Sequence, residues 1–383
     1  MAETAYMGGS CFHGDRILGS AVVRELDITE FRGIRRLAKP LELSSFNVLI
    51  GRNNVGKTAV LEALYMLTMP LPHTIPPPYG RGVVDFIAEK HGGSAAREQG
   101  RKWSLLVYGY AGTAVLKYRL GVKAKTSIPT KIGSCAEAAL GFKEVSIESI
   151  QVEISSERDL LRVLADGVEL ESSSYESFLA SMGADLKRSP IALYVPNDSS
   201  AYAQISSYVM RDDVFSWIEK EGAHRRAVQD IIAPAVYDKF TEVTIRRNEL
   251  CVRKEVSEEI GPLYIGVGSL GEGVKRVLLI YMLVEYLKPK LLLWDDLEVA
   301  AHPSLLESVL RWLASSRRQV VVSTHSIDVL HTITVVRPRD CRVLVLRKSP
   351  QDVMEYKALT LDDIEDILES GVDPRKIIEE LEL

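Results

Sequence analysis

Cysteine is scarce in this chain, and no two cysteines stand close together. The 383 residues contain four of them, Cys11, Cys135, Cys251 and Cys341, without a CxxC pair. Structural zinc sites and disulfide frameworks need clustered or regularly spaced cysteines, so this spacing argues against both. We therefore expect a reducing, cytoplasmic environment.

Long apolar runs are also lacking. The most apolar stretch, residues 277–287, is too short to span a bilayer and contains Glu285. Residues 1–20 lack the apolar core of a signal peptide and are predicted to form a loose N-terminal extension. We therefore expect no membrane association.

An excess of charge of one sign is the third feature that is missing. The chain has 47 Lys and Arg against 52 Asp and Glu, a net charge of −5. This balance argues against a strongly cationic nucleic-acid binder and leaves a local basic patch open. A hydrophobic content of 46% is ordinary for a globular protein, and the length allows one large or two moderate domains.

The strongest positive signal is the segment GRNNVGKT at residues 51–58, which fits the pattern Gly-x-x-x-x-Gly-Lys-Thr. An apolar run, residues 46–50, precedes it and predicts a buried strand. Residues 57–69 follow, with apolar side chains at helical spacing before Pro70, and predict an amphipathic helix that the proline ends. A strand, a loop and a helix in this order are the context that a phosphate-binding loop requires.

The residue types of the loop explain how it would bind a nucleotide. Gly51 and Gly56 permit a tight turn whose backbone N–H groups converge on phosphate oxygens at a helix N-terminus. Lys57 would reach the β- and γ-phosphates, and the Thr58 hydroxyl would ligate Mg²⁺. We therefore predict ATP and Mg²⁺ as cofactors. The predicted nucleotide contacts of the loop are Gly51, Asn53, Asn54, Gly56, Lys57 and Thr58.

Two carboxylates follow a second apolar run, residues 291–294. The carboxyl end of a parallel strand is where α/β folds bind ligands. Asp295 is suited to hold Mg²⁺ beside Thr58, and Asp296 to orient or deprotonate an attacking water. The alternative is that both carboxylates merely cap the helix that begins after Pro303.

Two further segments complete the pattern. His325 follows a strand predicted over residues 318–324 and would hydrogen-bond the γ-phosphate, unless it only caps the next helix. Ser269 and Gly271 lie before a helix predicted over residues 274–287, where small residues form an anion site. Because the chain already has one phosphate loop, a second anion site makes most sense if it caps the nucleotide of another subunit. The alternative is a plain glycine turn.

The rest of the chain alternates strands and helices. From residue 265 onward we predict strand, turn, helix, strand, helix and strand, which indicates a mostly parallel sheet in an α/β fold. The other predicted strands, hairpins and helices are a strand at 22–31, a hairpin of 103–110 with 113–122, a hairpin around Asp166-Gly167, helices at 175–182 and 214–240, a buried strand at 191–195, a hairpin at 241–253, a strand at 342–346 and two short C-terminal helices.

These motifs, in this order, resemble the ABC-type ATPase superfamily of P-loop proteins, and within it the RecF-like and OLD-like AAA-family ATPases. Residues 30–34, EFRGI, resemble a segment that opens those domains, and DDLEVAAHP at 295–303 resembles their DEPExHLHP segment. VVVSTHSIDVL at 320–330 resembles their switch-histidine strand. The resemblance covers residues 22–70 and 262–347 well and the middle poorly.

The resemblance implies a P-loop fold of the ABC type, with an antiparallel β subdomain and a mixed helical insertion. It divides the chain into a discontinuous core, 21–124 and 241–348, an insertion at 125–240 and a C-terminal helical segment at 349–383. It also implies a head-to-tail ATP-sandwich homodimer, in which Ser269 and Gly271 of one subunit contact the γ-phosphate held by Lys57 of the other. We expect no TOPRIM nuclease domain in this chain, and we expect a separate partner, such as an effector nuclease.

Two departures from the family pattern predict slow hydrolysis. The signature is Gly268-Ser269-Leu270-Gly271, and Asp296 stands where the family has a catalytic glutamate. The leading hypothesis is an ATP hydrolase that drives or gates a partner in DNA repair or defence. The alternatives are a nucleotide-gated sensor with little hydrolysis and, less well supported, the ATPase subunit of a transporter. Nucleic-acid binding stays open, because basic residues cluster at 224–226, 246–247 and 253–254.

Overall fold

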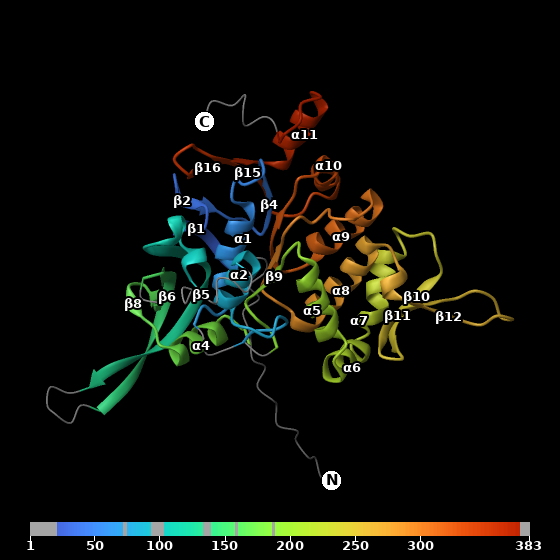
Figure 1. Cartoon of the computed structure of the whole chain (residues 1–383), viewed down its shortest axis with the longest axis horizontal. Helices are drawn as coiled ribbons and strands as arrows, with labels where there is room; N and C mark the ends of the chain where they lie inside the picture. The colour runs from blue at the N-terminus through green and yellow to red at the C-terminus, as the bar shows by residue number, and fades with distance from the viewer. Residues whose placement is uncertain are drawn as a thin grey trace, which may run out of the picture.

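A computed structural model describes residues 21–71, 75–92, 103–132, 139–157, 160–185 and 188–375. A large mixed sheet runs through the middle of the molecule, with helices α8 and α9 on one side of the view and the antiparallel strands β5 to β8 on the other (Figure 1). The predicted N-terminal extension and the last C-terminal helix lie outside the described residues. No helix within the described ranges is long and apolar enough to cross a membrane.

Parallel strands build the half of the sheet that carries the sequence motifs. The order is β15, β4, β14, β13 and β9, and all four pairings are parallel. These strands are apolar because helices or other strands cover both faces. Their bounds are β4 Phe46–Ile50, β9 Ala192–Val195, β13 Leu291–Trp294, β14 Gln319–Ser323 and β15 Cys341–Lys348.

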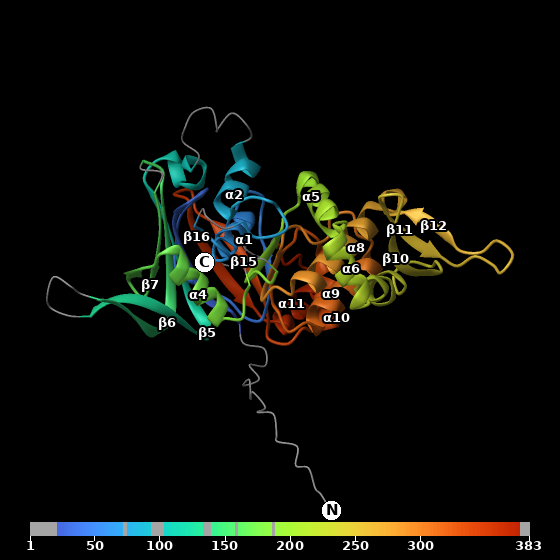
Figure 2. The ribbon, with the colours of Figure 1, turned by 90° about the horizontal axis from the view of Figure 1, so that it is seen from below.

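Mostly antiparallel strands build the other half, which continues through β16, β2, β1, β5, β6, β7 and β8, with β3 paired to β1; only the pairing of β16 with β2 is parallel among these described strands. Strands β5 and β6 form a long ribbon that extends from one end of the molecule (Figure 2). Their bounds are β1 Val23–Phe31, β2 Ile34–Leu37, β3 Leu41–Glu42, β5 Thr113–Ile132, β6 Ala139–Ser155, β7 Leu160–Ala165, β8 Val168–Glu169 and β16 Val353–Leu359.

Helix α1, Lys57–Met66, lies where the two halves of the sheet meet. It contacts β1 as well as β9, β13 and β14, and the Tyr118 hydroxyl of β5 donates to the Ala63 carbonyl at 2.6 Å. The predicted amphipathic helix is therefore buried on all sides: only Thr58 among its residues is not classed as buried. Burial on every face explains why even Glu62, a charged residue, has no exposed surface.

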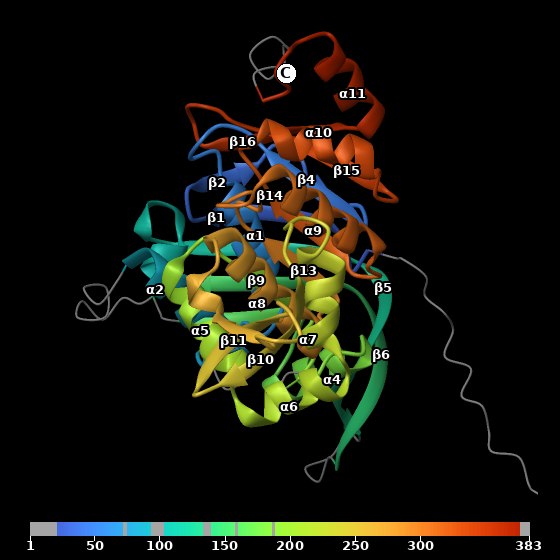
Figure 3. The ribbon, with the colours of Figure 1, turned by 90° about the vertical axis from the view of Figure 1, so that its right-hand side faces the viewer.

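The other helices cover the sheet and fill the segment between β8 and β10. α11 lies at one end of the molecule beyond β16, and α4 and α6 at the opposite end (Figure 3). Their bounds are α2 Val83–Gly92, α4 Ser172–Ser181, α5 Ser199–Val209, α6 Asp212–Lys220, α7 Ala223–Arg226, a π-helical turn η3 Ala227–Ile232, α8 Glu272–Leu287, α9 Pro303–Ser315, α10 Ile327–Val336 and α11 Leu361–Glu369.

The predicted α/β fold is confirmed, but several elements differ from the expectation. Residues 103–110 form two 3₁₀ turns, η1 Ser104–Leu106 and η2 Tyr108–Tyr110, and not a strand. Strand β5 already pairs with β1 on one edge and β6 on the other, so no edge is left for them. The helix predicted over 214–240 breaks at Gly222, whose φ is +70°.

Two strands have partners that the sequence pattern did not indicate. β12, Leu263–Gly266, belongs to a separate antiparallel sheet with β10, Phe240–Arg246, and β11, Glu249–Lys254, and not to the parallel sheet. β9 lies inside the predicted insertion, yet it pairs with β13 at the edge of the parallel sheet. The middle of the chain thus supplies a strand to the sheet that carries the motifs.

Candidate functional site

The loop between β4 and α1 has the backbone conformation that its glycines permit. Gly51 and Gly56 have φ values of +150° and +107°. A Cβ atom at Gly51 would lie 2.6 Å from the Leu346 carbonyl oxygen, and one at Gly56 would lie 2.4 Å from Met354 Cε. Because neighbouring strands crowd both positions, side chains larger than hydrogen are excluded there, and the loop stays tight.

Lys57 lies within this loop, with 6% of its surface exposed. Its ammonium donates to the carbonyl oxygens of Gly51 and Arg52 at 2.9 and 3.2 Å. Burial lowers the pKa of Lys57, while the carboxylates of Asp296, Asp295 and Glu298 oppose that shift. The Lys57 ammonium therefore lies where phosphate oxygens would enter the loop.

Asp295 is joined directly to the phosphate loop. The Thr58 hydroxyl donates to its carboxylate at 2.9 and 3.2 Å, and Ser323 Oγ donates to Oδ1 at 2.7 Å. The Tyr194 hydroxyl, from β9, approaches Oδ2 at 3.3 Å. A hydroxyl and a carboxylate in contact, beside a phosphate loop, are the hard oxygen ligands that Mg²⁺ takes together with substrate phosphates, so these residues fit the ion.

Asp296 follows with φ +49°, and two neighbours hold it in place. Its backbone N–H donates to Ser323 Oγ at 2.8 Å, and Asn197 Nδ2 donates to its carboxylate at 3.1 Å. Asn197 Oδ1 in turn accepts from Arg276 of helix α8 at 3.2 Å. The carboxylate is thus connected through Asn197 to the helix that follows the signature segment.

Asn197 was missed by the sequence reasoning. The only signal was its place two residues beyond an apolar run, after Pro196. Its position becomes informative once β9 is seen beside β13, because their carboxyl ends then lie together.

His325 lies at the carboxyl end of β14, next to the phosphate loop, because β14 pairs with β4. Its backbone N–H donates to Glu298 Oε1 at 2.7 Å, and its carbonyl accepts from Arg375 at 2.5 Å. The other oxygen of Glu298 is buried without a hydrogen-bond partner. The backbone of His325 is therefore held by Glu298 and Arg375, which both lie outside strand β14.

The helix-capping alternatives are wrong for both motifs. Helix α9 is capped by His302, whose side chain accepts from the Ser304 N–H, and not by Asp295 or Asp296. Helix α10 is capped by Ser326, which accepts from the Asp328 N–H, and not by His325. None of Asp295, Asp296 and His325 is the N-cap of these helices, so capping does not explain their positions.

Ser269 and Gly271 occupy the exposed end of α8. Ser269 ends a 3₁₀ turn, η4 Val267–Ser269, and Gly271 is the residue before the helix. A Cβ atom at Gly273 would lie 2.1 Å from the Ala300 carbonyl oxygen, so the start of α8 packs tightly on the loop after Asp296. Within the described part of the chain, no hydrogen bond joins Ser269 or Gly271 to the phosphate loop of the same molecule.

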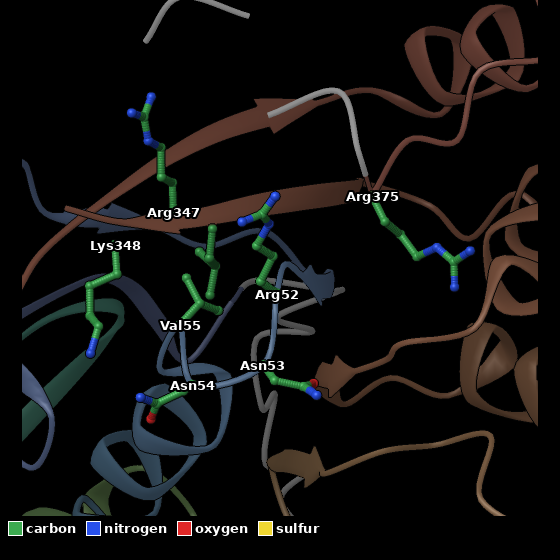
Figure 4. A pocket seen from close by; sticks show the side chains of 8 residues that line it. Arg52, Asn53, Asn54, Val55, Arg347, Lys348 and Arg375 are labelled. Carbon is green, nitrogen blue, oxygen red and sulfur yellow. The ribbon is translucent and has the colours of Figure 1, made fainter. Parts of the chain in front are cut away.

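A cavity of about 380 Å³ opens on the outer side of the phosphate loop. Figure 4 shows Arg347 and Lys348 projecting from β15 in opposite directions, and Arg375 of the C-terminal segment with its side chain pointing away from them. Half of its lining residues are basic, but Lys348 is paired with Asp352 at 2.9 Å and Arg375 with Asp373 at 2.6 Å. The lining residues are Arg52, Asn53, Asn54, Val55, Leu346, Arg347, Lys348 and Arg375.

The basic clusters that left nucleic-acid binding open are largely paired with carboxylates. Arg225 lies 3.0 Å from Glu242, and Arg253 lies 2.7 Å from Glu255. Lys254 contacts Asp238 at 2.8 Å. This pairing leaves less free positive charge on the small sheet than the sequence suggested.

Two protein-family models match separate parts of the chain. The family described as "AAA domain, putative AbiEii toxin, Type IV TA system" matches residues 147–330, and a family of unknown function, DUF2813, matches residues 21–86. Curated proteins gave no match.

Solved structures of SMC heads share the fold. An SMC head bound to the C-terminal winged-helix domain of ScpA has a TM-score of 0.53 and 12% identity, covering 89% of this chain and 99% of that one. An SMC head from Pyrococcus furiosus with an extended coiled coil, bound to the C-terminal domain of ScpA, has a TM-score of 0.52 and 11% identity, covering 91% and 99%. At these identities the likeness establishes the fold alone.

Proposed function

We propose that this chain, an ABC-type P-loop ATPase of the RecF-like and OLD-like kind, binds MgATP and pairs head to tail with a second copy around the nucleotide. The observation that carries the proposal is the Thr58–Asp295 hydrogen bond. It joins the phosphate loop to the acidic strand end, with Asp296 next along the chain and Asn197 bonded to it. Residues from distant parts of the sequence therefore form one site.

Nucleotide binding would depend on the phosphate loop and Lys57. The N–H groups at the start of α1 and the Lys57 ammonium would stabilise the phosphates. Thr58 and Asp295 would hold Mg²⁺, which would supply positive charge to neutralise the phosphates. Asn53 and Asn54 lie on the same loop and line the cavity beside it.

Hydrolysis would be carried by Asp296 and His325. Asp296, positioned by Asn197 and Ser323, would orient or accept a proton from the attacking water. Its side chain is one methylene shorter than glutamate, which places the carboxylate further from a water at the γ-phosphate and slows the reaction. His325 would contact the γ-phosphate from the neighbouring strand.

The exposed signature supports pairing between two copies. Ser269 and Gly271 are exposed and lie at the N-terminus of α8, where the helix dipole favours an anion. In a head-to-tail pair this end would complete the phosphate site of the other subunit.

Asp296→Asn tests this proposal directly. The variant keeps the shape of the side chain and removes its base, so it should bind MgATP and accumulate as a dimer, seen by light scattering after size exclusion. Asp296→Asn combined with Ser269→Arg should bind ATP and stay monomeric, because a bulky cation blocks the trans contact. An Asp296→Asn protein that is saturated with ATP and entirely monomeric would contradict the pairing.

A second candidate is a nucleotide-gated regulator that hydrolyses ATP very slowly. Asp296 and the altered signature favour it, since both weaken groups that act on the γ-phosphate. Single-turnover phosphate release separates the two: release within minutes supports the hydrolase, and none over hours supports the regulator. In either form, we propose that the ATP-bound pair gates a partner in defence or DNA repair, as the matched toxin-system family suggests.

A further inference from the structure

A buried network of charged side chains lies on the far side of Asp295 from the phosphate loop. Glu62 of α1 has no exposed surface. It contacts Lys90 at 3.1 Å, His91 at 2.6 Å and Arg32 at 3.4 Å. None of these residues belongs to the predicted nucleotide motifs, so the function proposed above leaves the network unexplained.

Lys90 connects this network to the metal-binding carboxylate. Its ammonium donates to the Tyr194 hydroxyl at 2.6 Å and lies 3.9 Å from Asp295 Oδ2. Tyr194 in turn donates to the same Oδ2 atom at 3.3 Å. Lys90 therefore acts on Asp295 in two ways, directly by charge and through a chain of two hydrogen bonds.

The direction of these hydrogen bonds is fixed by chemistry. An ammonium has only donors, so Tyr194 must accept from Lys90 and can then donate its single proton to Asp295.

The network joins two carboxylates, Asp295 and Glu62, with two cationic side chains, Arg32 and Lys90, and with the His91 ring. Lys90 is only 15% exposed and Asp295 only 5%, so water screens their interaction poorly. A divalent cation that binds Asp295 beside Thr58 must therefore do so next to a resident positive charge.

We propose that Lys90 is a positioning residue of the metal site. It holds Asp295 through Tyr194, and its charge sets the Mg²⁺ concentration at which the site is half-saturated. The inference rests on the proposed MgATP binding and adds a residue from α2 to it. Glu62 has the opposite effect, because it draws the Lys90 ammonium toward itself and away from Asp295.

The test is the Mg²⁺ concentration that half-saturates binding of a fluorescent ATP analogue, mant-ATP, followed by anisotropy. Lys90→Met removes the competing charge and should lower that concentration by about tenfold, given the strength of charge interactions at short distance in a protein interior. Glu62→Gln releases Lys90 toward Asp295 and should raise it. Lys90→Arg, which keeps the charge, should stay within about twofold of the wild type.

Two further variants keep the result interpretable. Lys125→Met removes an exposed lysine of β5 that pairs with Glu144, and should not change the Mg²⁺ requirement. If Lys90→Met fails to fold, the double variant Glu62→Gln with Lys90→Met removes one charge of each sign from the buried network. It should lower the half-saturating Mg²⁺ concentration in the same way.

Opposite shifts for Lys90→Met and Glu62→Gln would support the proposal. An unchanged or raised requirement in Lys90→Met, or in the double variant when that is the one that folds, would overturn it. A wild-type protein that binds no mant-ATP at any Mg²⁺ concentration would instead overturn the proposed function, so the two failures are distinguishable.

Discussion

The two halves of the proposed composite site differ in how they are built. The phosphate-loop half is buried: Lys57 and Asp295 are 6% and 5% exposed, and Glu62 behind them is fully covered. The signature half, Ser269 and Gly271, lies on the surface at the start of α8. One half is therefore completed by the folding of a single chain, whereas the other lies at the surface, where it would meet a second copy in the proposed pair.

This difference separates effects on stability from effects on assembly. Substitutions in the buried half alter charges that are largely shielded from water, so they affect the folded state itself. Substitutions in the exposed half should leave the stability of the chain unchanged and affect only the association of a second copy with this surface. Four predictions test this separation, beginning with the largest expected effect.

Glu62→Ala should destabilise the folded chain the most. It leaves Arg32 and Lys90 largely buried without their carboxylate, and removing one partner of a buried ion pair typically costs about 3–5 kcal/mol of unfolding free energy. Urea denaturation followed by circular dichroism measures the loss. Glu144→Ala, which breaks an exposed pair with Lys125, is the matched control and should cost less than about 1 kcal/mol. Equal losses in both variants would show that the buried network does not stabilise the fold.

Lys57→Ala should abolish nucleotide binding with a smaller effect on stability. The affinity for mant-ATP should fall by at least about a hundredfold, roughly 2.7 kcal/mol, because the point charge on the phosphates is lost. Lys39→Ala, at an exposed lysine that lies over the Tyr356 ring, should bind mant-ATP as the wild type does. Wild-type affinity in Lys57→Ala would disprove the nucleotide site.

Ser269→Arg should affect only assembly. Binding of mant-ATP to the monomer should stay within about twofold, while dimerisation in MgATP weakens by at least about tenfold, since a bulky side chain forced into a close contact typically costs about 1–3 kcal/mol. Sedimentation at several protein concentrations measures both states. Ser173→Arg, an exposed serine on α4, should dimerise normally. If both variants lose the dimer, the signature surface has no special role in pairing.

The smallest effect should appear in how the free energy of unfolding changes at acidic pH. Burial alone would raise the pKa of Glu62, but His91, Lys90 and Arg32 hold it below its usual value. A carboxyl with a depressed folded pKa stabilises the fold above its unfolded pKa, about 4.3 for glutamate, and this contribution is lost as pH falls through the folded value. The stability difference between wild type and Glu62→Gln should therefore be constant from pH 6 upward and shrink below about pH 4, by urea denaturation. A difference that grows on acidification would contradict the assigned direction.

The elements with local signals were predicted well. The strand at 46–50, the loop at 51–58, the acidic strand end at 295 and the strand before His325 all lie where their patterns indicated. Each depends on neighbours in the chain: an apolar run sets a buried strand, and glycines set the turn that follows it. The hairpins predicted around Asp166-Gly167 and at 241–253 were also confirmed, because their turns likewise depend on neighbouring residues.

The elements that depend on distant partners were predicted poorly. Residues 103–110 are apolar enough for a strand, yet both edges of β5 are already occupied. Asn197 and Tyr194 became site residues only because β9 pairs with β13, about a hundred positions away. Lys90 gave no sequence signal at all, since a lysine near the end of a helix is ordinarily solvated.

The sequence by itself thus determined that this protein has a phosphate loop, an acidic strand end and a strand-end histidine, because those features are set by residue types at short spacing. Only the tertiary structure decided which side chains surround them. Parallel pairing brings the ends of β4, β9, β13 and β14 to one edge of the sheet. The fold also buries α1 on every side, which places Glu62 and Lys90 behind Asp295. Such neighbours follow from packing across hundreds of residues, and no local pattern encodes them.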